Sequence, residues 1–222
     1  MGGASSLYRL DKLASQGRIV VVSTNYRLGV LGFMAHPAFA QSNGVNGNYG
    51  LEDQRAAMRW VQRNISAFGG DPTKVTIAGE SAGAGSVCAH ISSPEHVEGL
   101  FSKAIILSGG CLQNLISITD AEKVGTIISD TVGCKGSKAE IVACMRNDKA
   151  QASVTNLLKA QGDYSVNHPV DLMPFSMVAG TPENPNFTFP RTSRLAMETG
   201  KLVAVPLLMG GARNELRLYV GY

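Results

Sequence analysis

Long hydrophobic runs are missing from this sequence. Among its 222 residues, no apolar run approaches the ~20 residues that a membrane-spanning helix needs. The first residues, MGGASS, also lack the basic and apolar regions of a secretory signal peptide. We therefore expect neither a membrane span nor a targeting segment.

An excess of one charge is also missing. The chain has 20 Lys and Arg against 17 Asp and Glu, a net charge of +3, and the basic residues are scattered along it. Proteins that bind nucleic acids usually gather such residues into a basic patch or run. We expect no nucleic-acid partner.

Cysteine is scarce, with four in the whole chain, at positions 88, 111, 134 and 144. Four cysteines are too few for a disulfide-dense scaffold, and no Cys-x-x-Cys motif is present for zinc or thioredoxin-like chemistry. No metal and no cofactor is therefore expected. Cys88 and Cys111 are interpreted as small buried residues rather than as reactive thiols.

The sequence does contain the material of a globular core, with 44% hydrophobic and 17% charged residues. Short apolar runs rich in β-branched residues predict buried strands, and helical spacing or helix-compatible sequence follows the first two of them. The predicted strands cover residues 19–24, 75–78, 104–107 and 205–209, and the clearest helices cover 51–66 and 81–93. Three further helix starts are suggested by Thr119 with Glu122, Ser137 with Glu140, and Asp148 with Gln151.

Strands and helices alternate along residues 19–107, which is typical of right-handed βαβ units. The predicted fold class is α/β, with an open, mostly parallel sheet flanked by helices. Residues 1–222 are expected to form a single domain. Five of the nine prolines fall in residues 162–191, which predicts a long ordered loop within that domain.

One motif in the sequence predicts a catalytic residue. Directly after the predicted strand at 75–78 the chain reads Gly79-Glu80-Ser81-Ala82-Gly83, the Gly-x-Ser-x-Gly form of a nucleophile on a tight strand-to-helix turn. The two glycines are expected to give the room that such a strained turn requires. The helix that follows points free N–H groups at an oxyanion, so the Ala82 N–H is the candidate donor. Ser81 is accordingly the candidate nucleophile.

Several longer runs around this motif resemble one family. They are NYRLG at 25–29, LGF at 31–33, GNYGLEDQ at 47–54, WVQRNI at 60–65, FGGDP at 68–72, GLFSKAI at 99–105 and SG at 108–109. Together with GESAG they are similar to the type-B carboxylesterases, the group that includes the cholinesterases. The likeness runs through most of residues 3–215.

The resemblance implies an α/β-hydrolase fold and a Ser-Glu-His triad in that order along the chain. The family's acid follows a strand in a Gly-x-x-x-Asp-Glu-Gly pattern, and Glu215 holds that place here. Two residues depart from the pattern, since Asn214 replaces the Asp and Leu216 the final Gly. Glu80, beside the candidate nucleophile, is part of the family's motif, so it gives little information about which substrate is bound.

The family's base should lie beyond the acid, yet no histidine follows Glu215. The histidines present, at 36, 90, 96 and 168, are interpreted as structural or surface residues. The family's glycine-rich oxyanion loop is also absent, so the chain resembles the central part of a larger esterase. We expect these residues alone to hydrolyse esters very slowly.

The family likeness also implies a disulfide between Cys134 and Cys144, as in cholinesterase-like members. Two reduced thiols are the alternative. A bridge would favour an extracellular or periplasmic location, since disulfides persist in oxidising compartments; the compartment is otherwise not predicted.

The predicted function is hydrolysis of a small carboxylic ester by Ser81, with Glu215 orienting a histidine from outside these residues. Two alternatives stay open: a catalytically silent fragment, and a cholinesterase-like adhesion protein that keeps the fold and binds partners. An intact motif around Ser81 argues against the adhesion protein, and the missing histidine supports the silent fragment. The sequence predicts neither the particular ester nor the oligomeric state.

Overall fold

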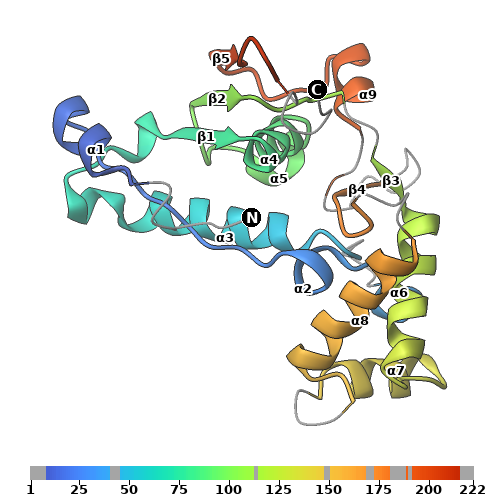
Figure 1. The fold of residues 1–222 in the computed structure, drawn as a ribbon. Helices are drawn as coiled ribbons and strands as arrows, with labels where there is room; N and C mark the ends of the chain where they lie inside the picture. Colours follow the sequence, from blue (N-terminus) through green and yellow to red (C-terminus); the bar gives the residue numbers. More distant parts are fainter. Residues whose placement is uncertain are drawn as a thin grey trace. The chain divides into compact units, whose positions relative to one another are not determined.

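The structure, a computed structural model, describes residues 9–40, 46–112, 115–147, 151–168, 173–180, 189 and 192–215 (Figure 1). The chain divides into two compact units. The sheet unit comprises residues 1–25, 54–113 and 191–222, and the helical unit comprises residues 26–53 and 114–190.

A three-stranded sheet organises the sheet unit (Figure 1). Its strands are β1 (Thr76–Glu80), β2 (Lys103–Leu107) and β5 (Leu207–Gly210), in the order β1-β2-β5 and all parallel. Three of the predicted strands and the parallel sheet are thus confirmed. Because the strands are parallel, their carboxyl ends, and the loops that follow them, lie at one edge of the sheet.

Helix α4 (Ala82–Ile91) packs against β1 and β2. Its residues 84–91 are buried, and its apolar side chains form a core with Met58, Phe101 and Ile106. The other helices of this unit are α1 (Asp11–Gly17), most of α3 (Tyr49–Asn64), α5 (Pro94–Val97) and α9 (Ser193–Glu198), with 3-10 turns η2 (Ile65–Phe68) and η3 (Pro72–Lys74). The helices predicted over residues 51–66 and 81–93 are therefore present, each shifted by a few residues.

The strand predicted over residues 19–24 is wrong, since residues 19–28 form neither helix nor strand. A β-branched run becomes a strand only where a neighbouring backbone supplies a hydrogen-bond ladder, and among the described residues, residues 19–24 have none. Ile19, Val20 and Val22 are consequently exposed. In the described residues β1 pairs with β2 alone, so β1 lies at the edge of the sheet, although its continuous apolar run predicts a strand buried on both faces.

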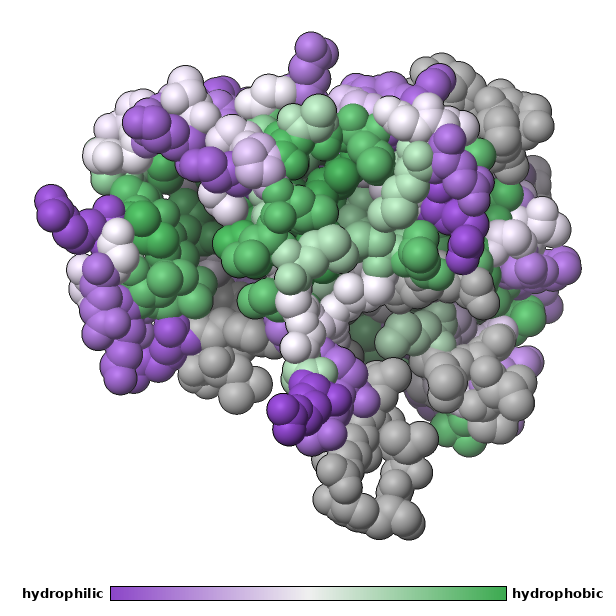
Figure 2. Space-filling model, turned by 90° about the horizontal axis from the view of Figure 1, so that it is seen from above, coloured by the Kyte–Doolittle hydropathy of each residue, from purple (hydrophilic) through white to green (hydrophobic). Residues whose placement is uncertain are grey.

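Strand β5 is exposed along its whole length, although a buried strand was predicted there. Leu207, Leu208 and Met209 keep 47%, 62% and 54% of their surface exposed. Figure 2, viewed from the β5 side of Figure 1, shows apolar side chains gathered on this face. Burial of a strand depends on the elements that pack against it, which its own sequence does not contain.

The helical unit is built around three helices, α6 (Ile118–Thr131), α7 (Lys138–Met145) and α8 (Val154–Asn167) (Figure 1). Their core includes Val124, Ile128, Leu157 and Tyr164. The unit also contains α2 (Gly29–Phe33), the 3-10 turn η1 (Pro37–Phe39), and the parallel pair β3 (Ile116–Ser117) and β4 (Val178–Ala179). No helix among the described residues is long and apolar enough to cross a membrane.

The helix starts of this unit agree with the sequence in part. Ser137 and Glu140 form the predicted capping box at the start of α7. Helix α6 begins two residues earlier than expected, since Ser117 accepts a hydrogen bond from the Asp120 N–H and is the N-cap. The third predicted start, Asp148, lies outside the described residues.

The loop predicted over residues 162–191 is shorter than expected, because α8 continues to Asn167. A full apolar stripe carries the helix through Gly162 and Tyr164, which overrides the weak glycine signal at its start. Strand β4 also falls within the predicted loop. Residues 169–172, 181–188, 190 and 191 of this segment lie outside the described residues.

Candidate active site

Ser81 occupies the turn between β1 and α4, as the motif predicts. Its backbone has φ 54° and ψ −116°, a region that L-residues avoid. A non-glycine residue there costs of order 1–3 kcal/mol and persists only where the surrounding structure holds it. Two backbone bonds hold this one: the Ser81 N–H donates to Leu107 O at 3.0 Å, and Ser81 O accepts from the Gly85 N–H at 3.1 Å.

The glycines around the turn differ in what they allow. A Cβ on Gly79 would overlap the backbone C and O of Gly83 and lie 2.7 Å from Ala84 N, so only glycine fits there. A Cβ on Gly83 would meet nothing within 4 Å. The close approach of strand and helix therefore depends on Gly79, and the expected need for space at Gly83 itself is not seen.

The start of α4 provides the candidate oxyanion donor. The Ala82 N–H belongs to the first turn of the helix, where N–H groups have no intrahelical acceptor and the helix dipole is positive. Ala82 is also exposed. Glu80, the last residue of β1, is exposed beside the turn.

Glu215, the candidate acid, follows β5 and is exposed. Its Oε1 accepts a hydrogen bond from the Ala212 N–H at 2.6 Å. The hydroxyl of Ser108, the residue after β2, also hydrogen-bonds the carboxylate. These bonds, that from Ser108 first, lower the pKa of Glu215 below its ordinary value. Leu216 lies outside the described residues.

Three strand ends bring these residues to one edge of the sheet. Ser81 follows β1, Ser108 follows β2, and Glu215 comes five residues after the end of β5. The ladder continues past the strands, since the Ser108 N–H donates to Gly210 O at 2.8 Å. The sequence analysis did not identify Ser108 as a site residue. Its position directly after the second strand of the βαβ unit could have indicated that it lies at this edge of the sheet.

His90 lies within the buried stretch of α4 and does not have the properties of a base. Its Nε2 lies 2.8 Å from Gln54 Oε1, and its Nδ1 has no partner among the described residues. Burial, and then the charge of Arg55, lower the pKa of His90 to about 3. His90 is thus a neutral, structural histidine, as interpreted from the sequence.

The other histidines also have structural surroundings. His36 is buried; its Nδ1 accepts from the Ala38 N–H at 2.9 Å, and its Nε2 lies 3.1 Å from Ser129 Oγ. His168 Nδ1 lies 2.9 Å from Tyr164 O, and its ring stacks on Tyr164. His96 is half-buried on α5.

Two disulfides are present in the described residues. Cys134 and Cys144 are joined as the family likeness predicts, with their Cα atoms 5.5 Å apart. Cys88 is buried as interpreted and Cys111 is half-buried, and the two form a second bridge, with a Cα separation of 5.2 Å, that the sequence did not predict. Their separation of 23 residues carried no signal, because the pairing depends on how α4 packs against the end of β2.

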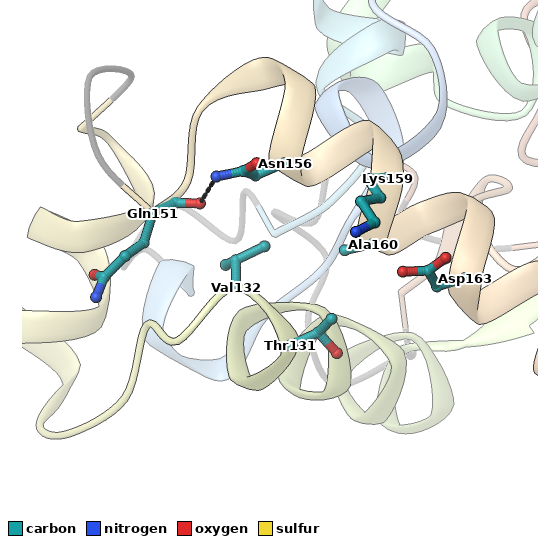
Figure 3. A pocket seen from close by; sticks show the side chains of 7 residues that line it. All are labelled: Thr131, Val132, Gln151, Asn156, Lys159, Ala160 and Asp163. Atoms are coloured by element: carbon teal, nitrogen blue, oxygen red, sulfur yellow. Dashed lines mark hydrogen bonds between the residues drawn. The ribbon is translucent and has the colours of Figure 1, made fainter.

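A pocket of about 250 Å³ lies in the helical unit, between α6 and α8 (Figure 3). It is lined by Thr131, Val132, Gln151, Asn156, Lys159, Ala160 and Asp163. The lining holds one cation and one carboxylate, and none of the candidate catalytic residues.

Comparison with known proteins gives consistent matches. The sequence model of the carboxylesterase family matches residues 1–222. Among curated proteins, the chain is 48% identical over 125 residues to a fumonisin B1 esterase of Sphingopyxis macrogoltabida, covering 55% of this chain and 23% of that protein. It is 39% identical over 180 residues to pyrethroid hydrolase Ces2e of Rattus norvegicus, covering 77% of this chain and 31% of that protein. It is 43% identical over 157 residues to esterase E4 of Myzus persicae, covering 70% of this chain and 28% of that protein.

Solved structures agree. A thermophilic PNB esterase matches with a TM-score of 0.83 and 32% identity, over 100% of this chain and 43% of that one. The chain therefore spans less than half the length of the proteins it resembles. The strand-turn-helix around Ser81, the α/β-hydrolase fold and the match over the whole sequence place this chain in the carboxylesterase family.

Proposed function

We propose that this chain carries the nucleophile and the acid of a serine carboxylesterase. Ser81 attacks the ester carbonyl, and the Ala82 N–H stabilises the oxyanion that forms. The alcohol leaves, an acyl group stays on Ser81, and water then releases the carboxylic acid. Glu215 orients the histidine base, which is supplied by residues outside these 222.

The backbone of Ser81 is the observation that carries this proposal. Positive φ at a serine is strained, and such strain is typically kept at functional sites. The turn puts Ser81 at the carboxyl edge of the sheet, at the start of α4, which is where a nucleophile of this motif is expected. A structural role alone gives no reason for this geometry.

Glu215 supports the proposal through its position. It follows the third strand of a sheet whose first strand leads to Ser81, and its carboxylate is held by hydrogen bonds from Ser108 and Ala212. A charged, hydrogen-bonded carboxylate can orient an imidazole and stabilise the imidazolium that forms when the serine loses its proton.

The substrate class is a small carboxylic ester. Two relatives are named for hydrolysing a fumonisin and pyrethroids, which are different molecules, so the names support the reaction more than any one substrate. The two disulfides support an oxidising location, extracellular or periplasmic. We also propose that both units belong to one domain, because one family match covers them.

Hydrolysis of an aryl ester tests this proposal. A longer protein that contains these residues and has the length of the carboxylesterase relatives, called here the protein of family length, should hydrolyse the ester. Ser81→Ala should remove that activity. Ser66→Ala, which changes an exposed serine of the sheet unit, should keep it. Residues 1–222 alone should be very slow, since a general base contributes ~10²–10⁴-fold. Turnover above about 1 s⁻¹ by residues 1–222 would show that another group is the base. No serine-dependent turnover at family length would favour the silent or adhesive alternatives.

A further inference from the structure

The Cys88–Cys111 disulfide joins two parts of the candidate active site. Cys88 lies on α4, seven residues after Ser81, and is almost fully buried. Cys111 lies three residues after Ser108, the hydroxyl partner of Glu215. The bridge is therefore a covalent link between the helix that begins at the nucleophile and the loop that holds the acid.

Residues 108–111 run along one face of α4. A Cβ on Gly109 would overlap the Ala84 side chain and lie 2.7 Å from Ser81 O, so this loop passes close to the turn itself. Ala84 and Cys88 are four residues apart and share a helix face. The loop thus contacts the first turn of α4 at Gly109 and is bonded to the next turn at Cys111.

Ser108 needs such support because its backbone is strained. Its φ is 49°, which a serine rarely adopts unless the surrounding structure holds it. On one side the Ser108 N–H donates to Gly210 O, at the end of β5. On the other side the disulfide holds Cys111 to the helix.

We propose that Cys88 and Cys111 are positioning residues, whose disulfide holds Ser108 and its partner Glu215 in register with Ser81. This inference rests on the proposed function for its catalytic consequence, while its structural part does not. Breaking the bridge frees the loop after β2, weakens the Ser108–Glu215 hydrogen bond and misplaces the carboxylate that orients the base.

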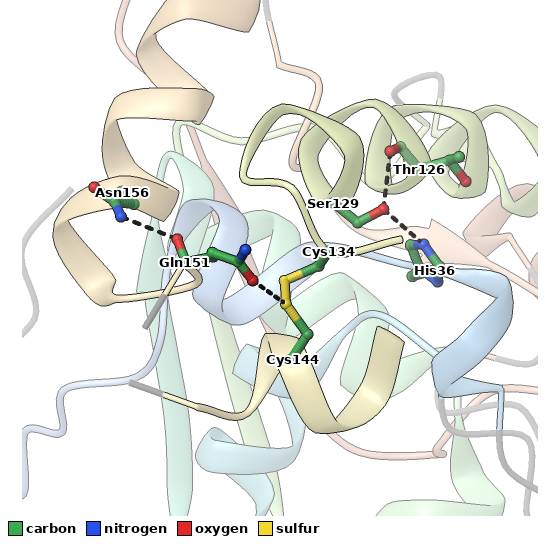
Figure 4. The surroundings of a disulfide bond; sticks show 7 residues. All are labelled: His36, Thr126, Ser129, Cys134, Cys144, Gln151 and Asn156. Atoms are coloured by element: carbon green, nitrogen blue, oxygen red, sulfur yellow. Dashed lines mark hydrogen bonds between the residues drawn. A yellow bond between two sulfur atoms is a disulfide. The ribbon is translucent and has the colours of Figure 1, made fainter. Parts of the chain in front are cut away.

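The second disulfide provides a matched control. Cys134 and Cys144 belong to the helical unit, where the bridge connects the segment that follows α6 to α7 (Figure 4). Gln151 Oε1 lies 3.2 Å from Cys144 Sγ, and the Asn156 side chain donates to Gln151 O. No residue of the candidate active site is among these neighbours.

The test compares two double variants that each keep one bridge, C88A/C111A and C134A/C144A. Carboxyl ¹³C NMR titration of Glu215, assigned with Glu215→Gln, measures its pKa in each, using residues 1–222. We expect the pKa of Glu215 to stay low in C134A/C144A and to return toward its ordinary value in C88A/C111A. Equal pKa values in the two variants would overturn the proposal.

Chemical reduction checks the same point in a chain that has already folded. A water-soluble phosphine reduces the remaining bridge of C134A/C144A: the phosphine becomes its oxide with an oxygen from water, and the two sulfurs take up two electrons and two protons. Once mass spectrometry shows complete reduction, the pKa of Glu215 should rise as in C88A/C111A. An unchanged pKa after complete reduction would contradict the proposal.

Steady-state kinetics of ester hydrolysis, measured on the protein of family length, distinguish this proposal from the proposed function. We expect kcat for an aryl ester to fall about tenfold in C88A/C111A with KM within about twofold, and C134A/C144A to keep its kcat, since misplacement by ~1 Å can cost ~10²-fold. A pKa shift in C88A/C111A without any Ser81-dependent hydrolysis would support the positioning role and overturn the esterase proposal. Unchanged kcat in an active C88A/C111A enzyme would overturn the positioning role.

Discussion

Ser108, the residue after β2, donates its N–H to Gly210 O at 2.8 Å, and its hydroxyl lowers the pKa of the Glu215 carboxylate that follows β5. The donor keeps the carboxylate charged at lower pH than an isolated glutamate would be. A triad acid that stays ionised is suited to hold an imidazolium through the catalytic cycle.

Removing this donor should raise the pKa of Glu215. We expect Ser108→Ala to shift the carboxyl ¹³C titration of Glu215 to higher pH, because the interaction that lowers its pKa most is lost. Ser117→Ala is the control, since Ser117 bonds Asp120 in the same way in the helical unit and should leave Glu215 unchanged. A pKa of Glu215 that does not respond to Ser108→Ala would show that the Ala212 N–H alone sets it.

The turn at Ser81 should depend on one glycine more than on the other. Gly79→Ala forces a Cβ into the Gly83 backbone and should lower the free energy of unfolding by roughly 1–3 kcal/mol. Gly83→Ala meets open space in a helix and should be neutral or slightly stabilising. Urea unfolding of residues 1–222 measures both; equal destabilisation by the two variants is incompatible with this packing.

The cysteines should be fully paired. A non-reducing peptide map is expected to give the pairs 88–111 and 134–144, with no thiol alkylated before reduction. On the loop-entropy model, the closed loops of 23 and 10 residues stabilise the fold by about 3.4 and about 2.7 kcal/mol. Any crossed pair, such as 88–134, would contradict the described fold.

His90 should make stability depend on pH. Its pKa in the folded chain is about 3, below the ordinary ~6.5 of the unfolded chain, so unfolding takes up a proton between these values. The stabilising contribution is present above pH ~6.5 and falls by about 1.4 kcal/mol per pH unit below it. His90→Gln should flatten this slope in urea unfolding measured from pH 7 to pH 4. Equal slopes for the two chains would mean that His90 titrates normally.

Local sequence was sufficient for the features that are decided locally. The strand-to-helix turn at Ser81 follows from glycine spacing after an apolar run, and the capping box of Ser137 with Glu140 is read directly from residue types. The parallel order of β1 and β2 follows from the helix that separates them in sequence.

Features that depend on distant neighbours were missed or predicted wrongly. Residues 19–24 have strand propensity but no ladder with any described residue, and the apolar residues of β5 are exposed in the part of the chain that the structure describes. The Cys88–Cys111 bridge and the Ser108–Glu215 bond both arise where the ends of different strands meet. A single sequence contains the residues of such contacts without specifying which of them meet.

The central claim is that Ser81 is an esterase nucleophile, and labelling with a fluorophosphonate tests it most directly. The protein of family length is treated with the reagent, digested and mapped by mass spectrometry. We predict one stoichiometric phosphonyl adduct on Ser81, absent in Ser81→Ala and retained in Ser66→Ala. No adduct on Ser81, or an adduct on a different serine accompanied by loss of ester hydrolysis, would contradict the account.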